Sequence, residues 1–202
     1  MGLERVIEDR ALVWSGEHWL AYLRDQEDAA DNGRVSLYHI RFSEAGEGKV
    51  AFVDIPRETG GLIGIYTDNE DVAKFVIEHV VRGNSNNPYY DRELPIVDAS
   101  ITQVGDIRTD PSWEIEAGDD KVVATWSSIH PALILEGPGP FIKGASVTHS
   151  ILFFTNEATI TLNGSLTGGV PYVRAEWMSA IGRQGMSTVF AISETTTTES
   201  SS

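Results

Sequence analysis

Histidine carries the side chain that titrates closest to neutral pH, and the chain has five, at positions 18, 39, 79, 130 and 149. No two of them have the short spacing that local metal motifs use. His39 and His149 are the best pair from separate segments, since each lies in the middle of an apolar, strand-like stretch. A histidine among such neighbours more often packs or contacts a ligand than binds a metal. We therefore predict no metal site and no cofactor, with His39 as a ligand contact and His149 as a candidate base.

The segment YYDRE at 89–93 gathers groups that can exchange protons or hold charge, inside a loop over 82–94 that is long enough to form a lid. Tyr90 or Asp91 can act as an acid, and Arg92 can hold an anion through paired hydrogen bonds. The alternative is a surface loop tethered by aromatic packing. His130, where a strand is expected to end, is a second candidate base, with a turn residue as its alternative.

The stretch VPYVRAEWM at 170–178 combines aromatic and charged residues. Its alternation places Tyr172, Arg174 and Glu176 on one face, which either lines the mouth of a cavity or forms ion pairs in water. An apolar or aromatic ligand needs flat apolar walls and a polar group that orients it. We expect these from the aromatic residues Trp126, Phe153, Phe154 and Trp177, with His149 and Arg174 as the orienting groups.

Several motifs with well-understood chemistry are missing. The glycine-rich segments at 59–64 and 166–171 lack the residues of a phosphate-binding loop, and they indicate strand kinks and turns. No Gly-x-Ser-x-Gly elbow is present, and the nearness of Ser127 and Ser128 to His130 in sequence does not make a catalytic triad. The acidic run at 67–71 lacks the glycine and the final glutamate of a calcium loop, and it indicates a helix cap.

Two early helices and eight to ten strands are expected to position these side chains. A helix over 16–30 is predicted by Ser15 as N-cap and by Trp14 and Trp19 at the spacing of a hydrophobic staple. A second helix, over 68–82, has apolar residues at helical spacing and Asp68 or Thr67 as its cap. A tight turn is expected at Asn156-Glu157. Strands are predicted at 35–42, 50–55, 60–67, 96–108, 112–118, 121–129, 130–141, 146–155, 158–162 and 188–195.

Sequential hairpins of this kind predict a mainly β fold, an antiparallel β-barrel or curled sheet with two α-helices in the N-terminal part. The second half lacks crossover helices, which disfavours a parallel sheet. The expected architecture is similar to that of lipocalin-like barrels, whose eight-stranded interior can hold one small ligand. That resemblance is one of architecture and carries no functional residue. We expect a single domain over 1–193 and a disordered Thr/Ser-rich tail over 194–202.

Charge limits the partners of the chain. Fifteen basic residues stand against 30 acidic ones, a net charge of −15. Residues 1–120 hold 25 acids and 11 bases, and residues 121–202 hold 5 acids and 4 bases. An acidic protein repels nucleic-acid phosphates and anionic membranes, so we expect neither as a partner. The absence of cysteine excludes thiol chemistry, and together with an N-terminus without an apolar targeting segment it indicates a cytoplasmic protein.

Three functions fit these observations. The first is a binding module that holds an apolar or aromatic small molecule in a barrel cavity. The second is a cofactor-independent enzyme, of isomerase, hydratase or cyclase type, in which His149 or His130 is the base and Asp91 or Tyr90 the acid. The third is an interaction protein whose near-neutral C-terminal sheet forms a homodimer.

Overall fold

The chain is built around one large sheet. The computed structural model describes residues 10–26, 28–56, 58, 61–85, 87–138 and 146–197. The ten strands that follow one another across the sheet are β1 (Leu12–Leu23), β2 (Gly33–Phe42), β3 (Gly48–Ile55), β4 (Leu62–Thr67), β5 (Ile96–Asp98), β6 (Ser100–Val104), β7 (Ser112–Ala117), β8 (Asp120–Ile129), β10 (Ser146–Leu162) and β14 (Thr188–Thr197). The remaining elements are β9 (Leu133–Pro138), β11 (Ser165–Leu166), β12 (Val173–Arg174), β13 (Gly185–Met186), helix α1 (Glu70–Val76) with a π-helical turn over Ile77–Val81, and helix α2 (Glu176–Ile181).

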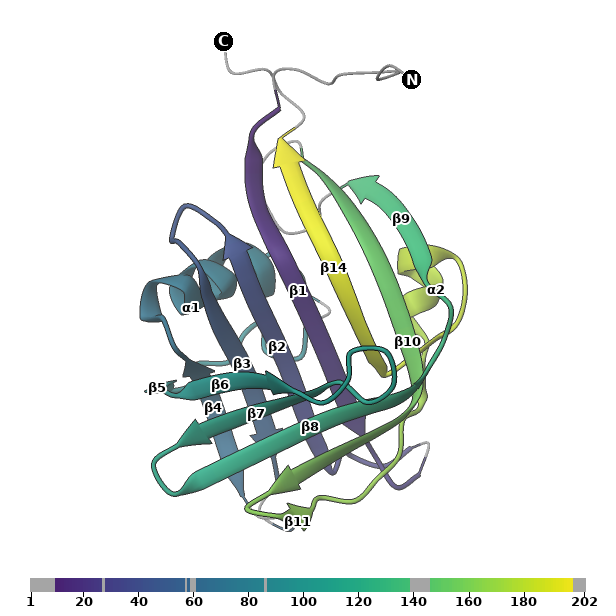
Figure 1. Cartoon of the computed structure of the whole chain (residues 1–202). Coiled ribbons are helices and arrows are strands. Elements are labelled where there is room, and N and C mark those ends of the chain that lie inside the picture. Colours follow the sequence, from purple (N-terminus) through teal and green to yellow (C-terminus); the bar gives the residue numbers. More distant parts are fainter. Residues whose placement is uncertain are drawn as a thin grey trace.

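The strand order makes the sheet a nearly closed barrel. Spatially the order is β5-β4-β3-β2-β1-β14-β10-β8-β7-β6. The two strands at its ends are consecutive in the chain, with only Ala99 between them, so the sheet must curl back on itself. Strands β6, β7 and β8 accordingly cross in front of the long strands (Figure 1). This confirms the mainly β, barrel-like fold, while the parallel pairing of β4 with β5 corrects the expectation of a purely antiparallel sheet.

Large aromatic side chains fill the inside of the barrel. Trp19, Trp113 and Trp126 are each at most 1% exposed. The ring of Trp19 meets the other two edge-on, at 6.0 and 5.2 Å between centroids, and stacks on Phe190 at 4.2 Å. The indole of Trp126 donates a hydrogen bond to the carbonyl of Leu20 at 2.7 Å. Interdigitated rings of this size make the interior a packed core.

Two further apolar clusters lie on the outer face of the long strands. Helix α1 and the segment after it pack on β2 and β3, with Phe52, Phe75 and Tyr89 among the buried residues. Helix α2 and β9 flank the other side, where Trp177 packs against the buried ring of Phe154. Figure 1 shows α1 and α2 behind the sheet, on either side of β1 and β14. Neither helix is long and apolar enough to span a membrane, and the same holds for every helix in the described part of the chain.

The first predicted helix is wrong, because residues 12–23 form strand β1. Ser15 caps no helix. It stands at a β-bulge, where the pairing with β2 shifts between Ser15 and Gly16. From Trp19 to Leu23 every side chain is buried, since one face of the strand enters the barrel and the other lies under the outer clusters. A strand buried on both faces has no alternating pattern and is easily mistaken for a helix.

The hairpin predicted around Asn156-Glu157 is also wrong, because β10 runs unbroken through both residues. Its first half pairs with β14 and its second half, from Thr155, pairs with β8. The polar pair therefore marks the point where β10 passes from one partner to the next. Opposite it, Ser128 has a positive φ of 55°, a local bend in β8 at the same corner.

The remaining predictions agree with the structure in most places. The hairpin β2–β3, strand β4 and the hairpin β7–β8 are confirmed. The second helix is confirmed, with Asn69 rather than Asp68 or Thr67 as its cap. Helix α2 was missed, so only one of the two helices lies in the N-terminal part. Residues 194–197 of the expected tail belong to strand β14, and residues 198–202 lie outside the described part.

Candidate functional site

A groove of about 500 Å³ crosses the outer face of the sheet between the two apolar clusters. Its floor is formed by alternate residues of β1, among them His18, Leu20 and Tyr22, and by neighbours on β2, β14 and β10. One wall is the segment that follows α1, with Val80, Asn84, Asn87 and Pro88. The opposite wall is made by β9, β12 and α2, with Leu135, Arg174, Trp177 and Ile181. The size is that of a site for a small organic ligand.

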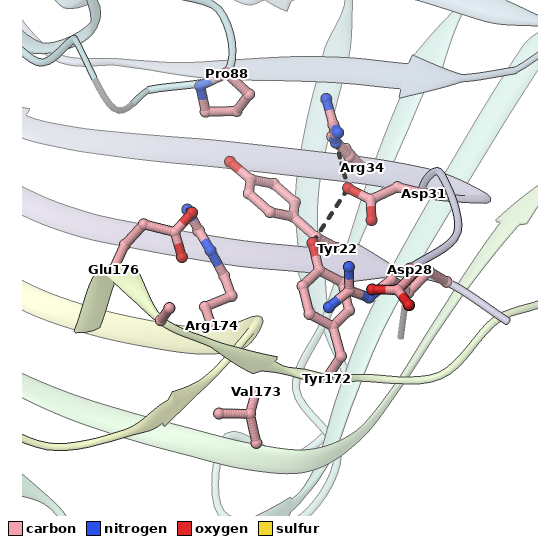
Figure 2. A pocket seen from close by; sticks show the side chains of 11 residues that line it. Tyr22, Asp28, Asp31, Arg34, Pro88, Tyr172, Val173, Arg174 and Glu176 are labelled. Carbon is pink, nitrogen blue, oxygen red and sulfur yellow. Dashed lines mark hydrogen bonds and ion pairs between the residues drawn. The ribbon is translucent and has the colours of Figure 1, made fainter. Parts of the chain in front are cut away.

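A second, more polar pocket of about 470 Å³ adjoins the groove. Both are lined by Tyr22, Pro88, Arg174 and Glu176, so they meet at these residues. Figure 2 shows charged side chains gathered around Tyr22 and Tyr172 in the polar pocket. Together the two pockets make a depression that is apolar at one end and charged at the other, which we call the outer groove.

Arg174 stands at the junction of the two halves. Its side chain is 14% exposed, and its nearest carboxylate is that of Glu176, at 3.5 Å and 54% exposed. The guanidinium also lies 5.2 Å from the centre of the Tyr22 ring. Its charge helps to lower the pKa of His18 and that of Glu176, after the larger effects of burial on His18 and of a backbone hydrogen bond on Glu176. A mostly buried cation with a largely solvated partner is well placed to hold an anion.

Two further arginines line the polar half. Arg34 is held by Asp31, which also accepts a hydrogen bond from the Tyr172 hydroxyl at 3.3 Å (Figure 2). The guanidinium of Arg24 stacks on the ring of Tyr172, 3.5 Å from its centre. Within the described residues Arg24 has no ion pair, and its buried Nε has no hydrogen-bond partner. Arg24 is therefore a second cation able to contact a ligand.

The phenols of the outer groove remain protonated at neutral pH. Burial, followed by the nearby Asp31 carboxylate, raises the pKa of Tyr172 to about 12. Burial also raises the pKa of Tyr22, and the charge of Arg174 only partly opposes that shift. Protonated phenols are hydrogen-bond donors rather than bases. The polar half therefore offers cations and neutral donors to a ligand.

Three of the residues predicted to contact a ligand lie at or under the outer groove. Arg174 and Trp177 line it directly. The Trp177 indole donates to the Met186 carbonyl at 2.9 Å, and its ring meets Phe154 edge-on at 5.1 Å between centroids. Phe154 itself is buried and supports Trp177 from below. Tyr172, Arg174 and Glu176, which were expected to share one face, all line the polar pocket, and Arg174 pairs with Glu176.

Other predicted ligand contacts lie inside the barrel or at its end. Trp126 is fully buried in the interior core, and Phe153 stacks on Phe190 at 4.8 Å on the same face of the sheet. The ring nitrogens of His39 lie 3.7 Å from Glu17 and 3.8 Å from Glu47. None of the three lines the outer groove. Trp126 and Phe153, which were expected to line a cavity inside the barrel, therefore belong to its packed interior, whereas both halves of the groove lie on the outer face of the sheet.

His149 and His39 are not assembled into one site. His149 pairs with Glu136 at 3.3 Å, whereas His39 has Glu17 and Glu47 beside it. In the described part of the chain, no group of three or more histidine, aspartate or glutamate side chains could hold a metal ion.

The acid and base candidates of the loop stand apart from the outer groove. Tyr90 and Asp91 are exposed, and so is His130 at the end of β8. Arg92 is bound to Asp54 on β3. None of these residues, nor His149, lines either half of the groove, although Pro88 and Asn87 of the same loop do.

Sequence reasoning missed the residues of β1 and β2 that form the groove floor. His18 lies in the segment predicted as the first helix, and Tyr22 and Tyr38 were not among the predicted site residues. The signal was present, since His18, Leu20 and Tyr22 alternate in β1. It was obscured because the intervening residues Trp19 and Ala21 are equally apolar and enter the barrel.

Neither a protein-family model nor any curated protein sequence matches the chain. The site must therefore be interpreted from its own chemistry.

Proposed function

We propose that the protein binds a small amphipathic anion in the outer groove, with an apolar or aromatic body over Leu20 and Trp177 and a carboxylate at Arg174. The observation that carries this proposal is the position of Arg174, mostly buried at the point where the apolar and polar halves meet. Such a site matches a ligand that has an apolar part and a negatively charged part in one molecule.

The apolar half supports binding of a hydrocarbon or ring. Leu20, Leu152 and Val189 are buried in its floor, and Trp177 and Ile181 stand on its wall. An apolar ligand that covers this surface gains about 25 cal/mol for each Å² removed from water. A few convergent polar groups among apolar walls are typical of small-molecule sites.

The polar half supports binding of the charged end. Its carboxylates do not cancel its arginines, because Asp31 is held by Arg34 and Tyr172 while Asp28 and Glu176 are exposed to water. Water screens an exposed carboxylate far more than it screens a buried guanidinium. Arg174 and Arg24 thus remain available to a ligand carboxylate.

Anilinonaphthalene sulfonate is a suitable probe, because it joins an aromatic body to a fixed negative charge. We expect its fluorescence to rise on binding to the wild-type protein. Arg174→Gln should weaken binding about tenfold or more, since a charge-assisted hydrogen bond contributes about 1.5–3 kcal/mol.

The matched control is Arg108→Gln, which removes an 83% exposed arginine paired with Asp106 on the turn between β6 and β7. This variant removes one positive charge, as Arg174→Gln does, but at a position away from the groove. It should leave the affinity for anilinonaphthalene sulfonate unchanged. Equal weakening by both variants would indicate a general charge effect, and an affinity that Arg174→Gln does not change would overturn the proposal.

Acid–base catalysis on the same ligand is the second candidate function. The specific observation is that the Glu176 carboxylate, whose pKa is lowered, lines the same groove as the protonated phenol of Tyr22. A carboxylate can remove a proton from the carbon beside a carbonyl group, while a neutral donor forms a hydrogen bond to the carbonyl oxygen. Incubation with a keto acid in heavy water distinguishes the two functions, because only an enzyme accelerates exchange of the hydrogens beside the ketone above the buffer rate.

A further inference from the structure

A cluster of uncharged polar side chains lies in the floor of the otherwise apolar half of the groove. The register of β1 and β2 pairs His18 with Tyr38, Leu20 with Ser36 and Tyr22 with Arg34. His18, Tyr22 and Tyr38 line the groove, and Ser36 is completely buried beneath them. Burying a polar group in an apolar floor costs free energy unless the group forms a hydrogen bond. Each polar group of this cluster is therefore expected to have a hydrogen-bond partner.

His18 is held in one orientation. Its ring stacks on that of Tyr38, with 4.0 Å between centroids and 10° between planes. Its Nε2 lies 3.2 Å from the Ser36 hydroxyl. Burial, followed by the charge of Arg174, lowers the pKa of His18 to about 3, so the ring is neutral at physiological pH.

The direction of the Ser36–His18 hydrogen bond decides which nitrogen of His18 carries the proton, because either partner can donate in it. The phenols of Tyr22 and Tyr38 also interact with Ser36, and burial raises the pKa of both, so both are protonated at neutral pH. A hydroxyl has one proton to donate and two lone pairs. When both phenols donate to Ser36, its own proton goes to His18 Nε2, and the neutral ring then carries its proton on Nδ1. Within the described residues His18 Nδ1 has no hydrogen-bond partner.

We propose that this cluster is a carbonyl subsite, in which His18 Nδ1–H donates a hydrogen bond to an uncharged oxygen of the ligand. The proposal rests on the function proposed above and narrows its ligand to an oxo acid, with a ketone a few atoms from the carboxylate. Arg174 and the cluster line the same half of the groove, so one short molecule can reach both. Ser36 is a positioning residue here, because it orients His18 without touching the ligand.

Two acids with the same skeleton test the subsite. β-Benzoylpropionate carries a ketone where γ-phenylbutyrate has a methylene, and each is titrated as a competitor of bound anilinonaphthalene sulfonate. We expect the keto acid to bind about fivefold more tightly to the wild-type protein, the ratio that one net hydrogen bond gives. His18→Phe keeps a ring to stack on Tyr38 and should reduce the ratio to about one, and Ser36→Ala should do the same.

A purely structural role for Ser36 would weaken both acids equally and leave their ratio unchanged, which would contradict the assigned role. His79→Phe is the control, because His79 is half-exposed on the π-helical turn outside the groove lining, and it should preserve the ratio. If the two acids displaced the fluorescent probe equally well, or if neither displaced it although it binds, the carbonyl subsite would be overturned and the proposed function would not. A probe that fails to bind would overturn the proposed function itself.

Discussion

His18 shows how much a single side chain depends on its surroundings. In sequence it is a histidine beside a tryptophan, and the structure makes it a neutral, stacked ring beside a buried serine. Nothing in the residue types alone predicts this, because the pairing of His18 with Tyr38 arises from the register of two strands. By contrast, the candidates Arg174 and Trp177 could be predicted from sequence, because their segment is rich in aromatic and charged residues.

The low pKa of His18 gives a testable pH dependence of stability. Its pKa is about 3 in the folded protein and 6.5 in the unfolded chain, so between these values the unfolded state binds a proton that the folded state does not. His18 therefore lowers stability as the pH falls below 6.5, by up to about 1.4 kcal/mol per pH unit.

Urea denaturation at pH 7 and pH 5 measures this contribution. We expect His18→Phe to lose less stability than the wild-type protein over that interval, with His79→Phe as the control that follows the wild type. Identical pH dependence in all three proteins would show that His18 titrates normally in the folded state.

At the scale of single elements, β1 determines where the site lies. One face of the strand sends Trp19, Ala21 and Leu23 into the barrel, and the other presents His18, Leu20 and Tyr22 to the groove. Because this segment was interpreted as a helix, neither its core-facing residues nor its groove-facing residues could be recognised. The short-range hairpins were predictable because their turns and alternation are local, whereas β1 depends on partners at both ends of the chain.

The bulge in β1 provides a sharp test of this strand. A Cβ on Gly16 would lie 2.2 Å from the His39 carbonyl oxygen, a backbone atom that cannot move without breaking the β1–β2 pairing. Gly16→Ala should lower the free energy of unfolding by about 3 kcal/mol, the upper range for overpacking. A helix in this segment would instead be stabilised by the alanine.

Gly137 in β9 is the matched control, since a Cβ there meets nothing within 4 Å. Gly137→Ala should change the stability by no more than about 0.5 kcal/mol. Chemical denaturation of both variants checks the pair, and a Gly16→Ala protein as stable as the wild type would contradict the close approach of β1 and β2 at the bulge.

At the scale of the whole molecule, the proposed binding site lies outside the barrel. The barrel's interior is filled by three tryptophans, while its outer face, flanked by α1 and α2, keeps an open groove. The succession of predicted hairpins indicated the barrel. It did not indicate that the interior is packed and the groove lies outside, because aromatic residues suit a packed core and a ligand cavity equally well. Which of the two they form depends on how strands distant in sequence bring them together.

The five tryptophans make the location of binding directly measurable. Trp14 and Trp177 line the outer groove, whereas Trp19, Trp113 and Trp126 lie inside the barrel. Each indole N–H gives its own signal in the NMR spectrum of isotope-labelled protein, and we would follow all of them during titration with anilinonaphthalene sulfonate. We predict shifts of the Trp14 and Trp177 signals while those of the interior three stay in place. Shifts led by Trp113 and Trp126 would place the ligand inside the barrel and contradict the outer groove as the binding site.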